Sequence, residues 1–179
     1  MSATRRQRIL TILVGFLLGS AAMAAGVREE VVSFLTHDGL EIRCLLSLPA
    51  KGEGPFPGML LIPGSGLHDA DVTLEISKLE ITTGRQTLFR PLARHFSRHG
   101  WAVQRCNKRG ASFGHVDDEP RLLEAATLED LVQDNRQALK ALHDHPNVEA
   151  RPLVLLGHSE GAQIAARLAV EDQNIDLLV

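Results

Sequence analysis

The sequence predicts an α/β fold in which a mostly parallel sheet, opened by an antiparallel hairpin, carries helices on both faces. Three observations predict it: apolar runs typical of strands, apolar residues at helical spacing between them, and an Asp-Gly turn between the first two runs. After the hairpin, strands alternate with helices, which favours parallel strands joined by right-handed crossovers. With 179 residues, 44% of them hydrophobic, the chain is long enough for one domain, which we expect over 25–179.

The elements follow in order along the chain. Apolar runs bounded by turn residues predict strands at 31–36, 40–48, 58–62, 101–106, 152–156 and 176–179. Helical spacing predicts helices at 87–99, 128–143 and 162–172. Thr127 and Asp130 are placed to cap the second helix. Ligand sites in such sheets lie beyond the carboxyl ends of the strands, where the loops 63–66, 107–110 and 157–161 are expected to meet.

The first 24 residues have the pattern of an export signal. Arg5, Arg6 and Arg8 precede an apolar stretch at 9–18, and small residues follow up to Ala24. This order predicts a cleaved signal peptide over 1–24, hence a periplasmic or secreted protein without stable membrane insertion. The alternative is an uncleaved anchor, but the apolar stretch is shorter than the roughly 20 residues that a membrane span needs.

Composition argues against several partners. The formal net charge is −3 and basic residues form no long run after the first eight positions, so no nucleic-acid partner is expected. No Cys/His spacing suggests zinc, and we expect the acidic residues of 67–86 and 117–119 to be solvated rather than metal ligands. Cys44 and Cys106 lie in apolar runs, which favours buried free thiols, although an oxidising compartment leaves a disulfide open.

The segment Gly157-His158-Ser159-Glu160-Gly161 connects a predicted strand to a predicted helix. A sharp turn there needs small flanking residues, which the two glycines provide, and it would raise Ser159 above the sheet edge at a helix N-terminus. The backbone N–H of Glu160, with that of Ser65 or Gly66 from the 63–66 loop, could hold a developing oxyanion. The pattern therefore predicts Ser159 as a nucleophile, with Ser65 and Glu160 forming an oxyanion hole.

Together with His37-Asp38-Gly39, Pro63-Gly64-Ser65-Gly66 and Asn107-Lys108-Arg109-Gly110, this turn makes the chain resemble the α/β-hydrolase superfamily over about 28–179. It is most similar to the bacterial exported esterase and serine-aminopeptidase-like branch. The resemblance implies a serine hydrolase that cleaves small carboxylic esters or short peptides through an acyl-enzyme on Ser159, without metal or cofactor. Two positions depart from the family pattern: Pro63 replaces a usual His, and Asn107 replaces a usual Asp at a position expected to be structural.

The activating groups of the serine are missing. In this superfamily an acid and a histidine follow the serine, but no histidine follows His158. Asp172 and Asp176 are expected at the wrong end of the sheet, and His68 is the histidine nearest the oxyanion loop. We therefore expect the chain as given to be inactive and to be the N-terminal part of a longer hydrolase. Its last strands, with the acid and the histidine, would lie beyond Val179.

Two alternatives remain open at this point. The first is a serine aminopeptidase-like peptidase, which needs an anionic pocket for the substrate amine. The second is a non-catalytic secreted binding protein on a degenerate hydrolase scaffold. Covalent labelling of the serine would separate an enzyme from a binding protein.

Overall fold

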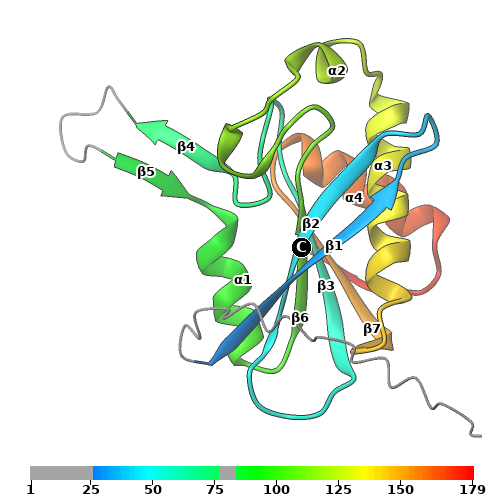
Figure 1. Cartoon of the computed structure of the whole chain (residues 1–179). Coiled ribbons are helices and arrows are strands. Elements are labelled where there is room, and N and C mark those ends of the chain that lie inside the picture. Colours follow the sequence, from blue (N-terminus) through cyan, green and yellow to red (C-terminus); the bar gives the residue numbers. More distant parts are fainter. Residues whose placement is uncertain (1–25, 77–83) are drawn as a thin grey trace, which may run out of the picture.

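The computed structural model describes residues 26–76 and 84–179, so the predicted signal peptide lies outside the described residues. Within them, six strands form the main sheet in the order β1-β2-β6-β3-β7-β8 (Figure 1). Strands β1, β2 and β6 pair antiparallel, and β6, β3, β7 and β8 pair parallel, so the predicted fold class is confirmed. The strands are β1 (Val27–Leu35), β2 (Glu41–Pro49), β3 (Phe56–Ile62), β6 (Ala102–Cys106), β7 (Val148–Gly157) and β8 (Ile175–Leu178).

Helices cover both faces of this sheet (Figure 1). Helix α1 (Phe89–Arg98) packs on one face, where Phe89 and Ala93 join a core with Met59 and Val103. Helices α3 (Leu128–His143) and α4 (Glu160–Glu171) pack on the other face and build the larger core. None of the helices within 26–76 and 84–179 is long and apolar enough to cross a membrane.

The start of α3 agrees with the prediction from the sequence, whereas the start of α4 differs from it. Helix α3 begins after Thr127, whose hydroxyl accepts the Asp130 N–H at 3.2 Å, while the Asp130 carboxylate accepts the Thr127 N–H at 2.8 Å. This reciprocal pair confirms the predicted cap. Helix α4 begins at Glu160, two residues before its predicted start, and therefore directly after Ser159.

Two small features were not predicted. Strands β4 (Thr73–Ile76) and β5 (Gly84–Thr87) form an antiparallel pair that projects from the sheet, and α2 (Pro120–Glu124) follows the loop after β6 (Figure 1). Strands of four residues and a helix of five are too short to show a reliable apolar period.

The prediction that the acidic residues of 67–86, an insertion after the 63–66 loop, are solvated was wrong for Asp69 and Asp71. Their exposed fractions are 3% and 4%. Asp69 accepts hydrogen bonds from the N–H and the hydroxyl of Thr73, both at 2.8 Å. Asp71 pairs with Arg90 and with Arg105. The burial of Asp71 was not visible in the sequence because its arginine partners lie 19 and 34 residues further along the chain.

Arg105 is the centre of a buried polar network. Its fully buried guanidinium donates to Asp71 at 2.8 Å, to the Ser47 hydroxyl at 2.7 Å and to Glu29 at 2.7 Å. Burial acts to raise the pKa of Asp71, but the bonds and charges of Arg90 and Arg105 outweigh it and hold this pKa below its usual value. The network fastens the start of the insertion to β1, β2 and β6.

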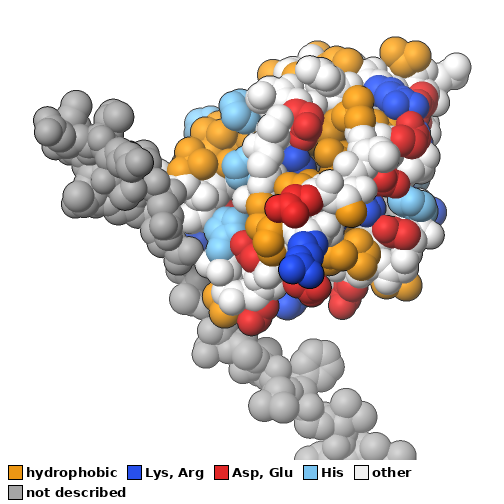
Figure 2. All heavy atoms as spheres, turned by 90° about the horizontal axis from the view of Figure 1, so that it is seen from above, with side chains coloured by type: hydrophobic (Ala, Val, Ile, Leu, Met, Phe, Trp, Pro, Cys, Tyr) orange, Lys and Arg blue, Asp and Glu red, His pale blue; other side chains and the backbone are white. Residues whose placement is uncertain are grey.

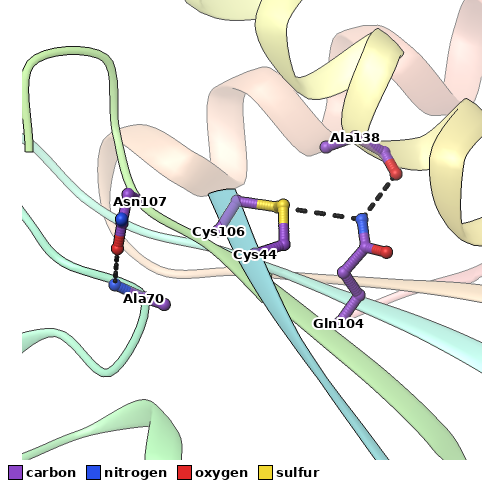
Figure 3. Close-up of a disulfide and its surroundings, with 6 residues drawn as sticks. All are labelled: Cys44, Ala70, Gln104, Cys106, Asn107 and Ala138. Carbon is purple, nitrogen blue, oxygen red and sulfur yellow. Dashed lines mark hydrogen bonds between the residues drawn. A yellow bond between two sulfur atoms is a disulfide. The ribbon is translucent and has the colours of Figure 1, made fainter. Parts of the chain in front are cut away.

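Cys44 and Cys106 face each other across β2 and β6 and form a disulfide (Figure 3). The preference for free thiols was wrong. Both residues lie in buried strands as predicted, but the register that places them opposite each other is not visible in the sequence. Beside the disulfide, the buried Gln104 amide donates to the Ala138 carbonyl at 2.6 Å.

Removing this disulfide should lower stability substantially. The bond closes a loop with a sequence separation of 62, for which chain entropy gives about 4 kcal/mol. We expect the double variant Cys44→Ala/Cys106→Ala to lose about 2 to 4 kcal/mol of unfolding free energy in urea titrations. Dithiothreitol should shift the wild-type midpoint and leave that of the double variant unchanged. A wild-type midpoint that reductant does not move would contradict a structural disulfide.

Candidate active site

Loops after β3, β6 and β7 meet at the carboxyl end of the parallel strands. Figure 2 looks down on this end and shows histidine side chains gathered near acidic, basic and apolar groups. The backbone contacts between these loops are direct: the His158 N–H after β7 donates to the Ile62 carbonyl of β3 at 3.0 Å. The Lys108 N–H after β6 donates to the His68 carbonyl at 2.9 Å. The structure thus confirms the prediction that the three loops meet at this edge of the sheet.

Ser159 occupies a strained turn between β7 and α4. Its φ of 56° and ψ of −119° lie in a region that only glycine adopts without strain. For a serine this conformation costs on the order of 1–3 kcal/mol. The side chain is exposed and makes no capping bond to the helix, so the hydroxyl is not used by the fold. The Gly161 N–H closes the turn onto the His158 carbonyl at 2.9 Å.

The two flanking glycines are required by close backbone approach. A Cβ at Gly161 would lie 2.2 Å from the Ile62 carbonyl oxygen, and one at Gly157 would lie 2.5 Å from the Ala162 Cα. Both distances are far inside van der Waals contact. The small residues inferred from the sequence are therefore needed to bring α4 against the end of β3.

The 63–66 loop lies directly beside the serine. A Cβ at Gly64 would be 3.1 Å from the Ser159 Cβ and 3.1 Å from Nδ1 of His158, so this glycine packs against both side chains. Ser65 is exposed, and its N–H makes no hydrogen bond within 26–76 and 84–179. Glu160 is the first residue of α4, where an N–H has no partner inside the helix. Two backbone donors are thus available next to Ser159.

The side chains of the loop after β6 bond to several neighbouring elements. Asn107 accepts the Ala70 N–H at 2.8 Å, which fits its expected structural role (Figure 3). Arg109 forms a bidentate salt bridge with Asp134 of α3, with both N···O distances at 2.8 Å. It also donates a hydrogen bond to Asp38 of the β1–β2 turn at 3.0 Å. Burial opposes this charge, but the Asp134 bond is stronger and raises the pKa of Arg109 above its usual value.

Lys108 is the site residue that sequence reasoning missed. Its ammonium donates to the Gly64 carbonyl at 2.9 Å and to the Glu160 carboxylate at 2.7 Å, with only 7% of the side chain exposed. One signal was present in the sequence: a lysine in one loop and a glutamate in another, both expected at the same sheet edge.

The groups considered as activators do not reach the serine. Nε2 of His68 lies 2.8 Å from the Ser65 carbonyl, and burial lowers the pKa of His68, so a neutral ring donates to that carbonyl. Asp172 is the C-cap that follows α4, and Asp176 accepts the Leu153 N–H at 3.0 Å. Within the described ranges, the Ser159 hydroxyl makes no hydrogen bond, and no group of three or more candidate metal ligands occurs.

The strand order, the strained serine turn and the 63–66 loop beside it (the glycine loop) define an α/β-hydrolase, and comparisons with known proteins agree. Residues 85–179 match the family model described as serine aminopeptidase, S33, and the chain belongs to this family. Esterase EstD of Thermotoga maritima is 32% identical over 119 residues, which cover 66% of this chain and 25% of the esterase.

Solved structures show the same fold at low identity. The α/β-hydrolase GrgF from a Penicillium species matches 84% of this chain and 44% of its own, with a TM-score of 0.60 and 20% identity. The Pyrococcus furiosus esterase Pf2001 matches 84% of this chain and 50% of its own, with a TM-score of 0.58 and 15% identity. The chain therefore spans half or less of each of these relatives.

Proposed function

We propose that this protein is an exported serine hydrolase that cleaves carboxylic esters through an acyl-enzyme on Ser159. The observation that carries the proposal is the exposed, strained Ser159 at the start of α4, beside the backbone donors of Ser65 and Glu160. Oγ would attack the acyl carbonyl and lose its proton to a base, while the two N–H groups hold the oxyanion. The ester alcohol leaves with that proton, and water then hydrolyses the acyl-enzyme.

The base and its acid partner are proposed to follow Val179. This is supported by the absence of a histidine bonded to Ser159 among the described residues and by the greater length of the relatives. Strand β8 is in keeping with further sheet, because Leu177 and Leu178 are exposed on it. Export is supported by the Cys44–Cys106 disulfide, since such bonds persist in oxidising compartments.

An ester substrate is preferred to a peptide on two grounds. Two of the relatives named above are esterases. A peptidase that releases N-terminal residues needs free carboxylates to bind the substrate amine. The acidic hollow of about 440 Å³ beneath the insertion contains Asp69 and Asp71, whose carboxylates already accept bonds from Thr73, Arg90 and Arg105.

A fluorophosphonate probe tests the proposal directly. The protein is expressed from its complete reading frame, incubated with the probe and digested for mass spectrometry. We expect one labelled peptide, modified at Ser159, together with hydrolysis of p-nitrophenyl butyrate. A folded protein that stays unlabelled would favour the non-catalytic binding protein instead.

A further inference from the structure

The geometry points to Lys108 as a positioning residue of the oxyanion hole, an inference that rests on the proposed function. Lys108 forms hydrogen bonds to both segments that carry the proposed donors. In the 63–66 loop it bonds to the residue before the donor, and at the start of α4 it bonds to the donor residue itself. On one side it holds the Gly64 carbonyl, which precedes the Ser65 N–H. On the other side it holds the carboxylate of Glu160, whose own N–H is the second donor.

The bond to Gly64 sets the direction of the Ser65 N–H. The Gly64–Ser65 peptide is trans, so its C=O and N–H point in opposite directions. The nearly buried Lys108 ammonium holds the C=O on the inner side of the loop. The Ser65 N–H must then point away from Lys108, and both Ser65 and Ser159 are exposed. Without this bond the Gly64–Ser65 peptide plane could rotate, and the Ser65 N–H would no longer be oriented toward the oxyanion.

The bond to Glu160 removes an unfavourable charge. A bare carboxylate on the residue after Ser159 would repel a developing oxyanion in a partly buried site. Lys108 pairs with that carboxylate at 2.7 Å. The same ammonium therefore orients one donor and neutralises the anion beside the other.

Lys108 is itself held on both sides along the chain. Its N–H is bonded to the His68 carbonyl, and the N–H of Asn107 to the Arg43 carbonyl at 3.0 Å. The disulfide at Cys106 lies two residues before it, and the Asp134 bond of Arg109 lies immediately after it. The ammonium is thus presented from a fixed loop, as positioning of a reactive centre requires.

The test separates positioning from simple stabilisation. In the protein expressed from its complete reading frame, Lys108→Met keeps an unbranched side chain one atom shorter and removes the charge and the donors. We expect kcat on p-nitrophenyl butyrate to fall about 10- to 100-fold while KM stays within about 2-fold. A short alkyl trifluoromethyl ketone, whose serine adduct carries the oxyanion, should bind more weakly by the same factor as kcat.

The control is Lys140→Met, which removes an exposed lysine paired with Asp144 and should leave kcat and inhibitor affinity unchanged. If Lys108→Met does not fold, Lys108→Arg carries the test. Arginine keeps the charge beside Glu160 but places its N–H groups differently against the Gly64 oxygen. We expect about 3- to 10-fold losses in kcat and in inhibitor affinity, in parallel.

The outcomes are distinguishable. An active wild type with a folded Lys108 variant of unchanged kcat and inhibitor affinity overturns the positioning role alone. Loss of stability with unchanged kcat per folded molecule does the same. A wild type that neither hydrolyses the ester nor binds the ketone overturns both the proposed function and this inference.

Discussion

Ser159→Ala is expected to lower kcat for p-nitrophenyl butyrate by about 10⁴- to 10⁶-fold, because the variant lacks the oxygen that attacks the acyl carbonyl. The loss should appear in kcat with little change in KM, since the hydroxyl forms its bond only as the transition state develops. The fold should survive, because the Ser159 hydroxyl makes no bond that the helix needs.

Ser33→Ala is the matched control, since Ser33 is an exposed serine on the edge strand β1. Steady-state kinetics on both purified variants, with circular dichroism to verify folding, provide the measurement. If Ser159→Ala retained a tenth or more of wild-type kcat, Ser159 could not be the nucleophile.

Gly161→Ala is expected to lower the unfolding free energy by more than about 3 kcal/mol and to abolish ester hydrolysis. Alanine normally favours a helix over glycine by roughly 1 kcal/mol, so helix propensity predicts the opposite sign. Here the new methyl would lie 2.2 Å from the Ile62 oxygen and 2.6 Å from the Pro63 oxygen. Both are backbone atoms at the end of β3, so the start of α4 and Ser159 with it must move.

Urea titration monitored by far-ultraviolet circular dichroism measures this loss. Gln163→Ala, at an exposed position in the same helix, should change stability by no more than about 0.5 kcal/mol. A Gly161→Ala protein within about 1 kcal/mol of wild type would mean that α4 does not pack on β3 as closely as described.

The sequence predicted those parts of the molecule that depend on neighbours along the chain. The bounds of α3 follow from its apolar period and the Thr127–Asp130 cap. The turn at Ser159 follows from its two flanking glycines, which are required because nearby backbone atoms leave no room for a Cβ. The parallel pairing of the later strands and the two-sided covering by helices follow from the alternation of elements.

The parts that were missed depend on partners distant in the chain. Whether Cys44 meets Cys106 is decided by the register of β2 on β6. Asp71 is buried because Arg90 and Arg105 converge on it from a helix and a strand. Lys108 likewise has a role only because two separate loops approach it. The sequence pattern alone does not show the first two of these contacts, whereas the third was signalled only by two loops expected at the same sheet edge.

The four-residue loop 107–110 has an evolutionary consequence. Its side chains bond to the insertion, the glycine loop, the start of α4, helix α3 and the β1–β2 turn. A substitution there would disturb several of these partners at once, so the loop has little freedom to vary. We expect descendants of this protein to keep the residues of the 107–110 loop while positions with fewer partners change.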